Sequence, residues 1–258
     1  MPDLHTTSYG DHGTPVVFLH GLFGQGRNWT QIAKSLADRH RTMLVDLPHH
    51  GRSRWDDHFD FVRIADQVAA LFDARDPVTL VGHSLGGKVA MIVALRRPEL
   101  VDRLCVVDVA PVGYDNSGEF AGYIEAMRRL DLRSLEQRSD ADEALREAVP
   151  NNTVRGFLLQ NLRREDDSWR WQINLEVLGD ELDVLGGWPE TDLAGAAPYD
   201  GPVLWIAGQR SDYVRDEHAA AMDALFPRNR RVTIKDAGHW VHSERPDVFV
   251  DVLRRFVD

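Results

Sequence analysis

Short, nearly continuous apolar runs recur along this chain of 258 residues, and stretches with helical periodicity lie between them. Such runs are typical of strands that are buried on both faces of a sheet. They predict strands over 16–20, 42–47, 78–82, 104–107, 203–207 and 232–235. The helical spacing predicts helices over 28–37, 64–72, 85–97 and 216–225, and a closing helix that begins near Pro246. This alternation predicts an α/β protein with a mostly parallel central sheet and helices on both of its faces.

The alternation is interrupted between 114 and 191, where strand signals vanish and amphipathic helices are expected. We therefore divide the chain into a core formed by 1–113 and 192–258 and a helical lid formed by 114–191. A lid over the strand ends would exclude water and supply an apolar pocket. Aromatic residues at such spacings more often pack a lid onto its core than contact a substrate. The candidate pocket residues are Phe23, His83, Phe157, Trp169, Trp171, Leu178, Trp188 and Trp240.

A serine stands at a sharp strand-to-helix junction in the sequence LVGHSLGGK. The glycines on either side of it, Gly82 and Gly86, allow the unusual dihedral angles and close packing that such a turn needs. A hydroxyl that projects from this turn can be reached by a base, so Ser84 is the candidate nucleophile. In folds with this turn, the oxyanion is bound by the amide after the nucleophile and by one from an earlier strand-end loop. Here those amides belong to Leu85 and Leu22.

A histidine in the sequence AGHW is the candidate general base, because it stands in a loop directly after the last predicted strand. This residue is His239, and the chain order of serine before histidine also fits such a site. His242 is its only local competitor, and we interpret it as a packing or surface residue that leads into the closing helix. A zinc site formed by the two histidines would need further ligands at suitable spacing, and the sequence offers none.

The acid that would orient the histidine has two candidates. Asp108 ends a predicted strand, and open α/β sheets gather their chemistry at the carboxyl ends of strands. Asp212 lies in the loop after the strand 203–207, where many hydrolases of this build carry the acid, but Ser211 occupies that position and Asp212 follows one residue later. We favour Asp108 and keep Asp212 as the alternative. In either case the carboxylate would accept the imidazole N–H and stabilise the imidazolium.

The segments HGLFG, DLPHHGRS, GHSLGGKVAM, VVDVAP and AGHWVHSERP together resemble the α/β-hydrolase superfamily. They resemble most its branch of small esterases, which includes bacterial short-chain esterases, a mitochondrial abhydrolase and yeast ethanol acetyltransferase. The resemblance covers almost the whole chain and implies a helical lid inserted after strand six and an acid at Asp108. One loop departs from the branch, which usually has Arg-Asn before His-Gly. This chain has Pro48-His49 before His50-Gly51, so substrate contacts of that loop are not carried over.

These residues predict a serine hydrolase that cleaves carboxylic esters with short to medium acyl groups, with thioesters as a second candidate class. Asp108 would orient His239, which would take the proton of Ser84, and water would release the acyl-enzyme. An alcohol acyltransferase, a cofactor-free haloperoxidase and a carbon–carbon bond hydrolase would keep the same serine and remain alternatives. Haloalkane dehalogenases and epoxide hydrolases are disfavoured, because they need a carboxylate nucleophile where this chain has Ser84. A non-catalytic ligand-binding module is also disfavoured, because it usually lacks one triad member and this chain supplies all three. No metal or organic cofactor is implied.

Composition changes this picture little. A net charge of −11 and a pI near 5.4 argue against a nucleic-acid partner, which would favour a basic patch. Arginine pairs such as Arg163-Arg164 are interpreted as solvated helix faces, and Cys105 as a small buried hydrophobe. No apolar run approaches about 18 residues, and the N-terminus lacks the features of a signal peptide. We therefore expect a cytoplasmic protein without membrane association, and the sequence leaves its oligomeric state open.

Overall fold

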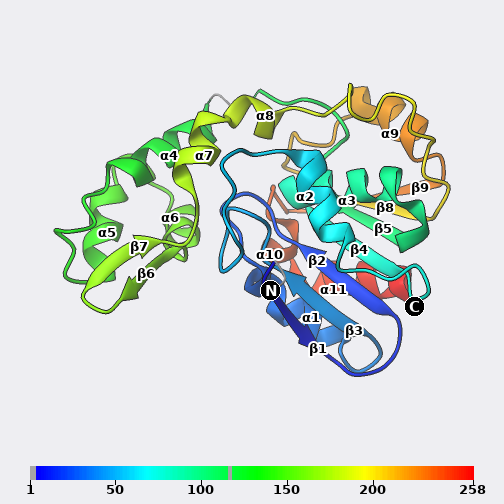
Figure 1. The fold of residues 1–258 in the computed structure, drawn as a ribbon, viewed down its shortest axis with the longest axis horizontal. Helices are drawn as coiled ribbons and strands as arrows, with labels where there is room; N and C mark the ends of the chain where they lie inside the picture. The colour runs from blue at the N-terminus through cyan, green and yellow to red at the C-terminus, as the bar shows by residue number, and fades with distance from the viewer. Residues whose placement is uncertain (1–3, 116–117) are drawn as a thin grey trace.

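A mostly parallel sheet forms the centre of the protein (Figure 1). The structure is a computed structural model that describes residues 4–115 and 118–258. Within these ranges the main sheet has seven strands in the order β1-β3-β2-β4-β5-β8-β9. β1 pairs antiparallel with β3, and the other neighbouring strands pair in parallel, which confirms the predicted fold class. The strands are β1 (Thr6–Tyr9), β2 (Pro15–Leu19), β3 (Arg41–Val45), β4 (Val78–His83), β5 (Val101–Val107), β8 (Val203–Gly208) and β9 (Asn229–Ile234).

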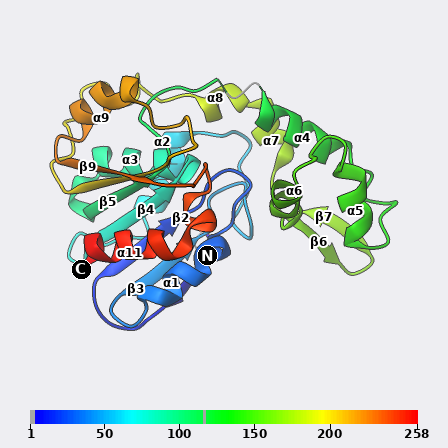
Figure 2. The same ribbon diagram turned by 180° about the vertical axis from the view of Figure 1, so that it is seen from behind.

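Helices cover both faces of this sheet, as Figures 1 and 2 show. Along β2, Val17 and Leu19 pack in the cluster that contains α2 and α3, whereas Val16 and Phe18 pack with α1 and α11. This division follows from the two-residue period of a strand. Within the described ranges, no helix is long and apolar enough to cross a membrane. The core helices are η1 (Gly26–Trp29), α1 (Thr30–Leu36), α2 (Phe61–Ala69), α3 (Leu85–Arg96), η2 (Pro98–Leu100), η3 (Asp216–His218), α9 (Ala219–Leu225), α10 (Val241–Glu244) and α11 (Pro246–Val257).

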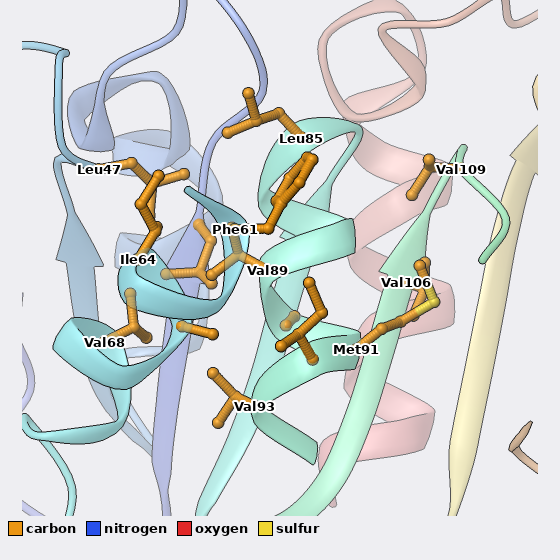
Figure 3. Packing of buried hydrophobic residues seen from close by; sticks show 14 of the residues in the cluster. Leu47, Phe61, Ile64, Val68, Leu85, Val89, Met91, Val93, Val106 and Val109 are labelled. Carbon is orange, nitrogen blue, oxygen red and sulfur yellow. The ribbon is translucent and has the colours of Figure 1, made fainter. Parts of the chain in front are cut away.

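Helix α3 is buried on all sides. Every residue of it from Leu85 to Leu95 is buried, because the sheet covers one side and α2 packs across another. Figure 3 shows Ile64 and Val68 of α2 beside the apolar side chains of α3. Lys88 is the one charged residue within this buried stretch, and close packing on every side restricts how far the helix can move. The start of α3, directly after β4, is therefore a fixed point of the core.

Residues 114–191, here called the inserted segment, lie between β5 and β8 in the chain and extend to one side of the core (Figures 1 and 2). At its outer end, Ala141, Leu145, Leu159 and Leu162 form a small apolar cluster of their own. The sequence predicts only helices in this segment, and that expectation is incomplete. Its elements are α4 (Glu119–Arg129), α5 (Arg138–Leu145), α6 (Asn152–Leu159), β6 (Leu162–Glu165), β7 (Ser168–Trp171), α7 (Leu175–Asp180) and α8 (Leu182–Gly186).

The strands β6 and β7 form an antiparallel hairpin that the sequence analysis missed. Its turn contains Asp166, whose φ of 50° lies in the left-handed region that aspartate tolerates better than most residues. The sequence SWRW alternates polar and aromatic positions, which is the strand signal that could have been used. Arg163 and Arg164 therefore lie in a strand, and their interpretation as a helix face is wrong.

Candidate active site

Ser84 occupies the turn between β4 and α3 in a strained backbone conformation. Its φ of 51° and ψ of −119° fall outside the regions that non-glycine residues usually adopt. The turn is tight because a Cβ on Gly82 would lie 2.2 Å from the carbonyl oxygen of Gly86. A Cβ on Gly86 would in turn lie 2.6 Å from the carbonyl oxygen of Leu19 in β2. The two glycines predicted to shape this turn are thus required by the packing around it.

His239 connects Ser84 to a buried carboxylate. Its Nε2 lies 3.0 Å from Ser84 Oγ, and its Nδ1 lies 2.7 Å from Asp108 Oδ2. The Tyr213 ring stacks on the imidazole with ring centres 4.2 Å apart, and His83 Nε2–H donates to the backbone carbonyl oxygen of His239 at 2.8 Å. In this arrangement Nδ1 donates to the carboxylate, which leaves Nε2 free to accept the serine proton.

Asp108 is fully buried and accepts several hydrogen bonds. Its Oδ1 accepts the backbone N–H of Gly208 at 2.9 Å, and its Oδ2 accepts both His239 Nδ1–H and the Ser211 hydroxyl. Like Ser84, it has a positive φ, of 53°. Buried carboxylates are tolerated when they are paired and hydrogen-bonded, and these donors supply such partners to both oxygens.

Asp212, the alternative acid, lies outside this cluster. Its side chain is 87% exposed and its Oδ1 lies 3.7 Å from the Arg215 guanidinium. The one-residue shift noted in the sequence therefore has a structural meaning, because the preceding residue, Ser211, is the one whose side chain reaches Asp108. The sequence alone gives Ser211 no role, because its contact with Asp108 depends on how two distant loops meet.

Two backbone amides beside Ser84 are available as donors. Among the described residues, the structure gives no hydrogen-bond acceptor to the N–H of Leu22 or of Leu85. The Leu85 amide begins α3, where unpaired amides and the helix dipole favour negative charge. The Leu22 loop passes close by, since a Cβ on Gly21 would lie 2.7 Å from His83 Nδ1 and 3.2 Å from Ser84 Cβ.

A cavity of about 30 Å³ opens at Ser84. This volume holds about one or two water molecules, or a group of similar size. Most of the wall residues were not predicted. Lys88 could have been found, because it lies one helical turn after Ser84, but Tyr114, Phe120 and Leu185 come from the inserted segment and depend on how it folds back. The cavity is lined by Leu22, Ser84, Leu85, Lys88, Val109, Tyr114, Phe120, Leu185 and Tyr213.

The predicted pocket residues do not line this cavity. Phe157 and Trp240 line a separate cavity of about 540 Å³ that also touches Asn28 and His242. The other side chains pack against protein. Phe23 and Leu178 are buried in the core cluster, and Trp188 packs against its edge. His83 lies beneath His239 as described above.

Two of the predicted pocket tryptophans, Trp169 and Trp171, are half-buried against other parts of the inserted segment. The indole N–H of Trp169 donates to the Leu135 carbonyl at 3.0 Å, and that of Trp171 donates to the Met127 carbonyl at 3.2 Å. Both rings also pack against the outer apolar cluster. Both indoles are half-buried and have their N–H groups bonded within the segment, which favours a packing role, and their contact with a substrate stays a prediction.

Lys88 joins the two ends of the inserted segment to α3. Its ammonium group donates to the carbonyl oxygens of Gly186 and Gly187, each at 2.6 Å, and lies 5.0 Å from the centre of the Tyr114 ring. The Tyr114 amide donates to the Gly186 carbonyl at 2.8 Å. Burial lowers the pKa of Lys88 to about 7. Lys88 and Tyr114, which line the Ser84 cavity, are therefore bonded to the Gly186–Gly187 stretch near the other end of the inserted segment.

The other histidines near the site are packed side chains. His242 stacks on Trp29 with ring centres 4.1 Å apart, and burial lowers its pKa to about 3. Burial and the neighbouring imidazoles of His239 and His242 hold the pKa of His83 well below its ordinary value. In the part of the chain that the structure describes, no group of three or more histidine, cysteine, aspartate or glutamate side chains could hold a metal ion.

The chain resembles known proteins over nearly its whole length. A family model described as the alpha/beta hydrolase fold matches residues 14–246. The sn-1-specific diacylglycerol lipase ABHD11 of Mus musculus is 36% identical over 257 residues, which cover 96% of this chain and 82% of that protein. Esterase YbfF of Escherichia coli is 32% identical over 257 residues, covering 98% and 96% of the two chains. A solved marine microorganism esterase superposes with a TM-score of 0.93, with 31% identity and 98% of both chains covered.

Proposed function

The chain belongs to the alpha/beta hydrolase fold family, and from this premise we propose that it is a serine hydrolase that cleaves carboxylic esters through an acyl-enzyme at Ser84. Its relatives include esterases and lipases, which makes ester hydrolysis the expected class of reaction. The observation that carries the proposal is the continuous hydrogen-bonded series from Asp108 through His239 to Ser84, which ends at a cavity.

The proposed reaction has two steps. Ser84 Oγ attacks the ester carbonyl carbon while His239 Nε2 takes its proton, and Asp108 stabilises the imidazolium. The amides of Leu22 and Leu85 bind the oxyanion, and His239 returns the proton to the departing alcohol. Water then attacks the acyl-enzyme, with His239 again accepting the proton, and the carboxylic acid leaves.

The inserted segment is proposed to act as a lid over this site. Tyr114, Phe120 and Leu185 line the cavity together with Ser84, so the segment would keep bulk water from the acyl-enzyme. With the inserted segment placed as in the structure, the cavity has room for about one or two small groups, which favours acetyl-sized acyl chains over longer ones. Short-chain esters are therefore the proposed substrates, and short-chain thioesters share the same carbonyl chemistry.

A fluorophosphonate probe and a series of p-nitrophenyl esters test this proposal. The probe should label the wild-type protein and Ser8→Ala, which changes an exposed serine on β1, but not Ser84→Ala. Hydrolysis should be fastest with the acetate or propionate ester and should fall about tenfold or more at the octanoate, because the cavity is small. Labelling that persists in Ser84→Ala, or a wild-type protein that hydrolyses none of the esters, would overturn the proposal.

A further inference from the structure

Four arginine side chains meet where the inserted segment adjoins the core, and they are here called the arginine cluster. Arg27 in η1 and Arg52 after β3 come from the core, whereas Arg138 in α5 and Arg163 in β6 come from the inserted segment. A cavity of about 180 Å³ is lined by Arg27, Arg52 and Arg163, and one of about 520 Å³ by Arg27, Arg138 and Arg163. Ser84 lines neither cavity, so the cluster is separate from the candidate active site.

Carboxylates do not neutralise this cluster. Elsewhere in this acidic chain arginines are commonly ion-paired, as Arg41 is with Asp76 at 2.9 Å and Arg155 with Asp142 at 2.8 Å. Among the described residues, no member of the arginine cluster has a carboxylate oxygen within 4.0 Å. Other arginines, such as Arg230, also lack an ion pair among the described residues, but the members of the arginine cluster differ from it because their charges act on one another and they line two adjoining cavities at one junction.

The guanidinium groups contact neutral acceptors instead. Arg27 donates to the Gln160 carbonyl at 2.7 Å, and Arg163 donates to Gln172 Oε1 at 2.9 Å. Each guanidinium carries five N–H donors, so these contacts leave donors available toward the cavities. Burial lowers the pKa of Arg163, and the nearby charges of the other members of the cluster lower it further. Like charges are therefore close enough to repel one another.

The acidic side chains in the two cavity walls are already engaged. Asp46 accepts the backbone N–H groups of Gly26 at 2.7 Å and Arg52 at 2.9 Å. Asp142 lies in the wall of the larger cavity and is bound by Arg155. Asp46 attracts Arg27 through space, but a single carboxylate balances one of the four positive charges.

We propose that the arginine cluster binds a phosphate group and that the bound anion joins the inserted segment to the core. Guanidinium forks match phosphate oxygens in pairs, and arginines on both sides of the junction can bind different oxygens of one anion. The anion would replace repulsion across the junction with attraction. It would add to the existing hydrogen bonds there, such as Gln25 Nε2 to Asn161 Oδ1 at 2.7 Å and the Gly51 amide to the Gln172 carbonyl at 2.8 Å.

Calorimetric titration at constant ionic strength tests the binding, because exposed charges are strongly screened by salt. Inorganic phosphate and pyrophosphate should bind the wild-type protein. Arg27→Gln and Arg163→Gln should each weaken binding about tenfold or more, and the double variant should abolish it. Arg230→Gln is the matched control, since Arg230 is an exposed arginine on β9 and has no ion pair among the described residues. Absence of binding up to about 10 mM phosphate, or equal weakening by Arg230→Gln, overturns the proposal.

Two further measurements identify the source of the phosphate and its effect. Binding of adenosine diphosphate is compared with binding of adenosine and of inorganic phosphate. Tighter binding of the nucleotide than of inorganic phosphate assigns the site to a larger phosphate-bearing ligand. Equal affinity for the nucleotide and inorganic phosphate assigns it to the free ion. Hydrogen exchange follows the Gly51 amide, whose acceptor lies in the inserted segment. Phosphate should slow this exchange in the wild-type protein but not in Arg27→Gln/Arg163→Gln. Unchanged exchange at saturating phosphate would refute the joining role.

Discussion

Replacing Asp108 by asparagine changes one carboxylate oxygen to an amide nitrogen and keeps the size of the side chain. The structure determines which oxygen is replaced. The Gly208 amide donates to Oδ1, so the carbonyl oxygen of the asparagine must stay at that position and its NH₂ must take the place of Oδ2. That NH₂ would face His239 Nδ1 and force the proton onto Nε2. In this tautomer, Nε2 directs a hydrogen toward Ser84 Oγ and cannot accept the serine proton.

We expect kcat/KM of Asp108→Asn on p-nitrophenyl acetate to fall by about 10³ to 10⁴. The corresponding substitution in a serine protease costs about 10⁴, which is about 5.5 kcal/mol of transition-state stabilisation. The rate of fluorophosphonate labelling should fall in parallel, because both reactions need a deprotonated serine. Circular dichroism and thermal unfolding should show that the variant remains folded.

Asp212→Asn is the matched control for this experiment. Its side chain is 87% exposed and its contact with Arg215 is a surface ion pair, so activity should stay within about twofold of wild type. The reasoning is refuted if a folded Asp108→Asn keeps more than about a tenth of the activity. It is also refuted if Asp212→Asn is the variant that loses activity.

Three other substitutions test separate parts of the site. In Gly21→Ala the new Cβ would lie 3.2 Å from Ser84 Cβ and closer still to His83, so the loop must shift. If the loop supplies an oxyanion donor, kcat should fall about 10²-fold. An unchanged kcat in steady-state assays would exclude that role. His83→Phe removes the donor to the His239 carbonyl and should lower kcat about tenfold with little change in KM, whereas a change confined to KM would point to substrate contact instead. Lys88 has a pKa lowered to about 7 from 10.5, so the unfolded chain binds more protons between these values and the stability of wild type should rise with pH relative to Lys88→Met. Urea unfolding should show this difference growing by about 2 kcal/mol from pH 7 to pH 9, and a constant difference would mean that the lysine stays charged when buried.

The core of the fold could be predicted because its strands are buried on both faces. Each predicted strand from 16–20 onward corresponds to a strand of the sheet. A short continuous apolar run such as VVFL in β2 is typical of a strand whose two faces are both buried. β1 escaped prediction because it is an edge strand whose residues, TTSY, are only partly buried and carry no apolar run. The hairpin β6–β7 escaped because half of its positions are exposed polar residues.

The sequence indicated Ser84, Asp108 and His239 but not most residues of the cavity wall, and this difference has a physical cause. Ser84 and Asp108 follow directly after β4 and β5, and His239 stands in the loop after β9, so the topology brings all three backbones to one edge of the parallel sheet. The cavity wall depends instead on how the inserted segment folds back over that edge. Its contacts, such as Lys88 with the carbonyls of Gly186 and Gly187, are made by backbone groups that leave no signature in the sequence.

Topology alone still leaves a gap, because β8 lies between β5 and β9 in the sheet. The loop after β9 must cross the end of β8 for His239 to reach Asp108. Gly208 ends β8, and a Cβ there would lie 2.1 Å from the carbonyl oxygen of Gly238, so only glycine lets the loop pass this closely. The same residue donates its amide to Asp108 Oδ1 and thereby fixes the carboxylate that receives the histidine. The alignment of His239 with Asp108 therefore depends on a residue without a side chain, which a search of the sequence for chemically active groups does not reveal.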